Sequence, residues 1–102
     1  MGGPSGVQTL RVTHLRARPG QLTALLAAAR GNAGAAASAT GCRSAEVCTD
    51  PDDPDTVLVV SRWASRSALE HFLGWHEKVA HGSLAASMAE PPRSVHYAVV
   101  DA

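Results

Sequence analysis

Apolar and polar residues nearly alternate over residues 7–17, which read VQTLRVTHLRA. Such alternation, with β-branched residues among the apolar ones, is typical of a half-buried strand. Pro19 and Gly20 interrupt it, and the next text, QLTALLAAAR, repeats its apolar residues at helical spacing. The pattern therefore predicts a strand over residues 7–17 and a helix over residues 21–38, which ends before Gly41.

Two further strands are indicated in the middle of the chain. Residues 42–50, CRSAEVCTD, read as an extended segment, and the text PDDPD at 51–55 is rich in residues that favour turns. The run TVLVVSRW at 56–63 is the most strand-like text in the chain, because half of its residues are β-branched. These residues predict a second strand, a turn and a third strand.

A second helix is predicted after the third strand. Ser65 and Ser67 both suit an N-cap, and Ser67 with Glu70 three residues later matches a capping box. We expect this helix to continue to residue 88 or 89, where a proline pair follows. The last element, SVHYAVV at 94–100, is a strand by alternation and composition.

The order strand, helix, strand, strand, helix, strand predicts an α+β fold of the ferredoxin-like βαββαβ type. Such a fold has an antiparallel four-stranded sheet with two helices on one face. We expect one domain over residues 7–102, preceded by a flexible lead at residues 1–6. The consecutive apolar residues Val57–Val60 would place apolar side chains on both faces of the third strand. A second copy of the chain is the simplest cover for the open face, so we expect a symmetric homodimer.

Charge and composition narrow the possible partners. Lys plus Arg equals Asp plus Glu, the formal net charge is +0, and the scattered basic residues give no electrostatic footprint for nucleic acid. No run of apolar residues is long enough for a membrane span, so we expect a cytoplasmic protein without a membrane partner. Cys42 and Cys48 would lie about 20 Å apart on a straight strand, too far for a disulfide, which predicts two reduced thiols.

Several short sequence segments together resemble those of the antibiotic biosynthesis monooxygenase superfamily of dimeric α/β barrels. The resemblance is carried by Pro19-Gly20, Gly41-Cys42, Asp50-Pro51, the third strand ending in Trp63, and the helical text SALEHFLGWHE. It implies a pocket between the sheet and the two helices in each subunit, and a homodimer formed by the sheet faces. Members of the superfamily include cofactor-independent oxygenases of aromatic polyketides, quinol oxygenases and haem-degrading enzymes.

Two positions depart from the pattern of that superfamily. Many members carry a glutamate two residues before the strand tryptophan, where this chain has Ser61. Many also carry a histidine nine residues after the tryptophan, where this chain has Phe72 beside His71. The usual polar pair is therefore not intact, and the site has to be derived from geometry.

Helical geometry indicates which histidine of the second helix faces inward. At about 100° per residue, Leu69, Phe72 and His76 share one arc, Trp75 lies at its border, and His71 falls on the charged side. His76 is therefore the candidate general base, because burial favours a neutral imidazole that can accept a proton. The alternative is a core histidine satisfied by one hydrogen bond.

The strands contribute further candidates. Trp63 and Tyr97 lie on strands that border the same layer, so we count both with His76 as candidate catalytic residues. Thr13 is a plausible small polar residue of the pocket, and His14 has the opposite parity. His14 and His96 are both on strands, and either can face the dimer interface instead.

Metal and nucleophilic chemistry are disfavoured. His71, His76 and His81 follow one another at intervals of five residues, which turns each pair by about 140° around a helix instead of aligning it. Neither cysteine has an adjacent basic partner that would activate it.

The resemblance and these residues together imply a cofactor-independent monooxygenase acting on an aromatic polyketide-type phenol or quinol. His76 is the expected base and Tyr97 or Thr13 the partner of the anion. The expected substrate-binding walls are Trp63, Leu69, Phe72 and Trp75. No cofactor is expected, with haem as the less favoured ligand. Two alternatives stay open: a polyketide cyclase or isomerase that uses the same pocket, and a non-catalytic dimeric ligand-binding module.

Overall fold

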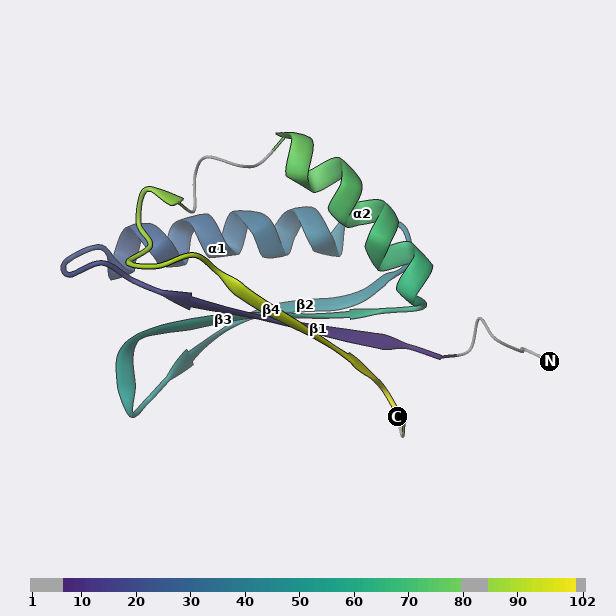
Figure 1. The fold of residues 1–102 in the computed structure, drawn as a ribbon, viewed down its shortest axis with the longest axis horizontal. Helices are drawn as coiled ribbons and strands as arrows, with labels where there is room; N and C mark the ends of the chain where they lie inside the picture. Colours follow the sequence, from purple (N-terminus) through teal and green to yellow (C-terminus); the bar gives the residue numbers. More distant parts are fainter. Residues whose placement is uncertain (1–6, 80–84, 101–102) are drawn as a thin grey trace.

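The computed structural model describes residues 7–79 and 85–100, with residues 76–79 described by their main chain only. The elements follow in the predicted order (Figure 1): β1 (Thr9–Arg16), α1 (Leu22–Ala37), β2 (Cys42–Asp50), β3 (Asp53–Trp63), α2 (Arg66–Val79) and β4 (Arg93–Ala98). The strands form one antiparallel sheet in the order β2-β3-β1-β4. The predicted ferredoxin-like α+β fold is therefore confirmed.

Both helices lie on the same side of the sheet, but they cover it unequally (Figure 1). Helix α1 packs along β2 and β3. Helix α2 begins close to the sheet, near the end of β3, and leans away from it along its length. The helix-facing side of β1 and β4 is consequently less covered than that of β2 and β3.

Strand register decides which side chains lie beneath the helices. In the antiparallel pairing, Arg11 of β1 stands opposite Ser61 of β3 on one side and His96 of β4 on the other. Because side chains alternate along a strand, the odd-numbered residues of β1 and β3 and the even-numbered residues of β4 share the helix-facing side. Burial agrees, since Leu15 and Val57 are almost fully buried there.

The apolar core is divided into two clusters on this helix-facing side. Polar residues occupy the sheet positions between the clusters, because Arg11, Thr13 and Ser61 all point toward the helix layer. One cluster joins α1 to the sheet and consists of Leu15, Ala17, Leu25, Ala29, Val57 and Met88. The other joins both helices to the end of β3 and consists of Ala36, Trp63, Leu69 and Phe72. A polar strip inside a small α+β domain is unusual for a purely structural layer and points to a site.

Three predicted boundaries were wrong. The helix expected to reach residue 88 or 89 is described as α2 only to Val79, and Met88 instead forms an antiparallel bridge with Ala17. That bridge competes with the helix because it lets Met88 bury its side chain in the first cluster. Strand β3 begins at Asp53, inside the expected turn, and β4 covers Arg93–Ala98.

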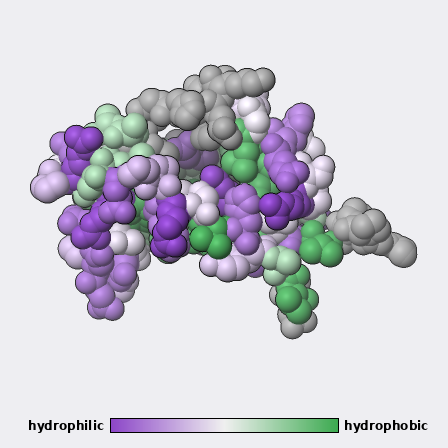
Figure 2. All heavy atoms as spheres, in the orientation of Figure 1, coloured by the Kyte–Doolittle hydropathy of each residue, from purple (hydrophilic) through white to green (hydrophobic). Residues whose placement is uncertain are grey.

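The tip of the β2–β3 hairpin is a hydrophilic projection, visible at the lower left of Figure 2. Its acidic side chains satisfy the turn, because Asp50 Oδ1 accepts from the Asp52 amide at 2.8 Å and Asp53 Oδ2 accepts from the Thr56 hydroxyl at 2.8 Å. Arg16 pairs with Asp53 at 3.0 Å across an exposed surface. The projection is thus a self-satisfied turn that tethers β1.

The opposite face of the sheet carries apolar side chains, and neither of the two described helices covers it. Leu10, Val12, Leu58 and Val60 project there by register, next to Tyr97 of β4, which is 51% exposed. The prediction that both faces of β3 are apolar is therefore confirmed.

Candidate active site

A row of polar side chains crosses β1 and β4 on the helix-facing side. Arg11 Nη2 donates to Ser94 Oγ at 3.0 Å, and the Ser94 and Thr13 hydroxyls are 2.9 Å apart. Thr13 is only 7% exposed, so its hydroxyl depends on that partner. His96 stands opposite Arg11 in the same row. The register therefore gathers a guanidinium, two hydroxyls and an imidazole beneath the helix layer.

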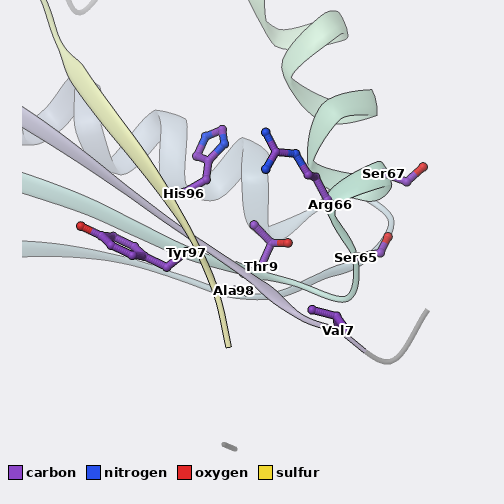
Figure 3. Close-up of a pocket in the computed structure, with 8 residues that line it drawn as sticks. All are labelled: Val7, Thr9, Ser65, Arg66, Ser67, His96, Tyr97 and Ala98. Atoms are coloured by element: carbon purple, nitrogen blue, oxygen red, sulfur yellow. The ribbon is translucent and has the colours of Figure 1, made fainter. Parts of the chain in front are cut away.

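The His96 end of this row borders a cleft beside the start of α2 (Figure 3). The cleft has a volume of about 480 Å³ and is lined by Val7, Thr9, Ser65, Arg66, Ser67, His96, Tyr97 and Ala98. In Figure 3 the guanidinium of Arg66 is directed toward the His96 ring, Thr9 lies below both, and the Tyr97 ring is on the other side of β4. The chemistry of the cleft is therefore concentrated on His96 and the two arginines around it.

His96 has the properties of a general base. Burial lowers the pKa of His96 below its usual range, and the positive charges of Arg11 and Arg66 lower it further, while the carboxylate of Glu70 acts in the opposite direction. A depressed pKa leaves the imidazole neutral near pH 7. A neutral imidazole can accept a proton, and the neighbouring cations would favour the anion left behind.

A second cavity lies on the other flank of α2, between α1 and α2. It has a volume of about 840 Å³, and Phe72 and Trp75 form its aromatic wall. Phe72 also packs on buried Trp63, with ring centroids 5.1 Å apart, and Trp75 lies 6.0 Å from Phe72. The aromatic residues therefore form a continuous series from the core to this cavity.

The start of α2 separates the two cavities. Ser65 Oγ accepts from the Ala68 amide at 3.1 Å and caps the helix, as one of the two predicted N-caps. Ser65 and Ser67 line both cavities. The main chain is held there by Gly41, whose carbonyl accepts from the Ala64 amide at 2.7 Å.

Residues 10–78, more than half of the chain, match the family model described as antibiotic biosynthesis monooxygenase. The chain belongs to that family. No curated protein matches the chain significantly.

Several solved structures share this fold. A candidate antibiotic biosynthesis monooxygenase from Caulobacter crescentus CB15 aligns with a TM-score of 0.81 at 20% identity, over 94% of this chain and 92% of that one. Another, from Chloroflexus aurantiacus J-10-fl, aligns at 0.67 and 26% identity, over 86% and 90%. A conserved protein from Methanosarcina mazei Go1 aligns at 0.80 and 14% identity, over 91% and 93%. This member of the antibiotic biosynthesis monooxygenase family therefore shares its fold with these three proteins.

The sequence-predicted residues divide between several places. Leu69 and Phe72 are buried as the helical count predicted, at 0% and 6% exposure, and Trp75 stands at the edge with 53% exposure. Trp63 is fully buried and its Nε1 donates to Ser61 Oγ at 2.9 Å. Ser61 is therefore the hydrogen-bond partner of the strand tryptophan in this family member.

Three histidines and the tyrosine are placed differently from one another. The side chain of His76 lies outside the described residues, so its expected role as base stays a prediction. Tyr97 projects from the helix-free face of the sheet, because it is one residue out of phase with His96, and so does His14. Tyr97 nevertheless lines the edge of the His96 cleft, so its expected role in a site stays a prediction.

His96 is the residue that sequence reasoning undervalued. The strict alternation of SVHYAVV separates His96 from Tyr97, but the text alone does not say which of the two faces the helices. The register between β1 and β4 decides this, because it pairs His96 with Arg11 on the helix-facing side.

Metal ligation and membrane insertion find no support in the described part of the chain. Within residues 7–79 and 85–100, no three His, Cys, Asp or Glu side chains are grouped as metal ligands. Neither described helix is long and apolar enough to cross a membrane. Both cysteines are free.

Proposed function

We propose that this family member is a cofactor-independent monooxygenase that binds a compact aromatic phenol or quinol in the cleft beside His96. The observation that carries the proposal is the position of His96: it lines a cavity, its pKa is lowered by burial, and Arg11 and Arg66 place positive charge beside it. Family membership supports an oxygenase. The cleft volume of about 480 Å³ suits a substrate of two or three fused rings.

The chemistry assigns each group a defined step. The substrate O–H gives its proton to the neutral imidazole of His96, and the resulting phenolate is stabilised by the field of the two arginines. The electron-rich anion then reacts with O₂ at a ring carbon. One oxygen atom remains in the product as a carbonyl, and the other leaves as water with two hydrogens from the substrate. The proton held by His96 returns to the departing oxygen, and the substrate supplies all four electrons that reduce O₂, so none has to come from a cofactor.

We further propose that the protein acts as a homodimer. The helix-free face of the sheet carries Leu10, Val12, Leu58 and Val60, and an apolar face of this kind is normally covered in a soluble domain. A second copy joined sheet to sheet would bury these side chains in a symmetric interface. Such a dimer would leave the helix layers, with their clefts, on its two outer sides.

Oxygen consumption with anthrone as substrate tests the proposal. Anthrone and O₂ would yield anthraquinone and water in equal amounts, which an oxygen electrode and the product absorbance can both follow. We expect His96→Gln to lower kcat/KM at least about 100-fold, the usual contribution of a general base. His76→Gln is the matched comparison, because His76 is the base predicted from the sequence.

The two substitutions separate the possible outcomes. Loss of uptake in His96→Gln with retention in His76→Gln supports the proposed base. Loss only in His76→Gln would reassign the base to the helix. Anthrone conversion without oxygen uptake would indicate a cyclase or isomerase, and binding without turnover would indicate a non-catalytic module.

A further inference from the structure

We infer that the ligand of the His96 cleft carries a carboxylate group, and that Arg66 at the start of α2 binds it. The inference rests on the proposed function only in placing the substrate in this cleft. It adds to the substrate a permanent negative charge, separate from the phenol O–H that His96 deprotonates. Val7 and Ala98, which line the same cleft, would contact the apolar ring system.

The guanidinium of Arg66 is anchored through one nitrogen and open at the other two. Its Nε donates to Glu70 Oε2 at 3.1 Å, one turn further along α2. Within the described residues, its terminal nitrogens Nη1 and Nη2 make no hydrogen bond, and Figure 3 shows them on the side that faces His96. Two N–H groups in the plane of a guanidinium match the two oxygens of a carboxylate. Glu70 therefore orients Arg66 for two parallel hydrogen bonds to a carboxylate in the cleft.

The charges around the cleft favour an anion. Among the described residues that line it, Arg66 is a cation and none is Asp or Glu. Arg11 adds a second positive charge from β1, where it stands opposite His96. The carboxylate that acts on the His96 ring is that of Glu70, and it engages the Nε side of Arg66. A negatively charged ligand is therefore attracted by two guanidinium groups against one carboxylate, and it should bind more tightly than a neutral ligand of the same shape.

The two arginines differ in a way that gives them different tasks. Arg66 is exposed, so a charged group can reach it from solvent. Arg11 is half-buried, and its Nη2 is fixed on Ser94 Oγ at 3.0 Å. Arg66 would thus hold the carboxylate, whose charge is the same before and after the reaction, while Arg11 would stabilise the phenolate that forms when His96 takes the proton. The substrate class is accordingly a hydroxyarene carboxylate.

Binding of 2-naphthoate, compared with 2-naphthamide, tests the charge preference. The two molecules share one ring system and nearly one shape, and only naphthoate is ionised at neutral pH. Neither carries a phenol O–H, so proton transfer to His96 takes no part. Equilibrium dialysis with absorbance detection measures both dissociation constants on the full chain. We expect naphthoate to bind about tenfold more tightly than naphthamide, the effect of hydrogen bonds to a charged group; equal affinities would overturn the inference.

Substitutions of arginine assign the preference to one side chain. Arg66→Gln should abolish it while leaving the affinity for naphthamide within about twofold, and Arg66→Lys, which keeps the charge without the paired N–H groups, should retain about threefold. Arg30→Gln is the matched control, because it removes one positive charge from an exposed position of α1 and should leave the preference intact. Thermal unfolding of each variant confirms that it folds. A preference that persists in Arg66→Gln, or that disappears in Arg30→Gln, would overturn the role of Arg66.

Oxygen uptake with anthrone separates this inference from the proposed function, because anthrone has no carboxylate. A naphthoate preference that depends on Arg66, together with no uptake, would support the carboxylate site and refute the oxygenase. Uptake together with equal affinities for naphthoate and naphthamide would refute the carboxylate site and support the oxygenase.

Discussion

Gly41 occupies a position where two independent effects oppose any side chain. Its φ is +87°, in the left-handed region, and a Cβ built there would lie 2.6 Å from the Cβ of Ala68 in α2. The left-handed conformation costs a non-glycine residue about 1–2 kcal/mol. Overpacking against the Ala68 Cβ adds about 1–3 kcal/mol. We therefore expect Gly41→Ala to lower the free energy of unfolding by the sum of these, roughly 2–5 kcal/mol.

Gly20 is the matched control, because only one of the two effects operates there. Its φ is +77°, yet no atom lies within 4 Å of a Cβ built on it. Gly20→Ala should therefore cost the conformational part alone, about 1–2 kcal/mol. Urea unfolding followed by far-ultraviolet circular dichroism measures both variants, and an unchanged m-value keeps the comparison two-state.

A double-mutant cycle isolates the steric part. Ala68→Gly removes the Cβ that clashes, at a helix-propensity cost of about 1 kcal/mol that the cycle subtracts. In the Gly41→Ala background it should recover about 1–3 kcal/mol relative to its effect in the unsubstituted protein. A coupling energy within about 0.5 kcal/mol of zero, or equal costs for Gly20→Ala and Gly41→Ala, would refute the reasoning. The result bears on function, because Gly41 supports the helix start that separates the two cavities.

Two further predictions concern pH and assembly. The folded-state pKa of His96 is lowered, so the unfolded chain protonates this imidazole at a higher pH than the folded chain does. The stability that depends on a neutral His96 ring is therefore fully present above about pH 6.5, and it is lost as pH falls toward the folded-state pKa. His96→Gln should flatten the dependence of urea-unfolding free energy on pH just below 6.5, and an unchanged slope would contradict the burial of the ring. Light scattering at micromolar concentration should show a dimeric mass for the unsubstituted chain and a monomeric mass for Val60→Lys, with Thr23→Lys, on the exposed side of α1, staying dimeric. A monomeric mass for the unsubstituted chain would rule out the sheet-to-sheet dimer.

Local patterns were sufficient to predict the elements and the face of α2. The alternation in β1 and β4, the N-cap at Ser65 and the buried positions of Leu69 and Phe72 all follow from backbone periodicity and capping chemistry, which act over a few residues. The end of α2 could not be predicted in this way. Alanine-rich text favours continued helix, but Met88 gains more by entering the cluster under α1 and bridging to Ala17, a contact that joins distant parts of the chain.

The sequence by itself determined the fold class, because the order of elements and their periodicities leave few ways to build one core, and short motifs carried the resemblance to the family. Only the tertiary structure decided which histidine can act. A strand histidine has two faces to choose from, and a shift of one residue in register exchanges them. The pairing of β4 with β1 sets His96 beside Arg11, and the tilt of α2 brings Arg66 to the same ring. Arg11 and Arg66 are far from His96 along the chain, so no local sequence pattern predicts the lowered pKa that makes His96 a candidate base.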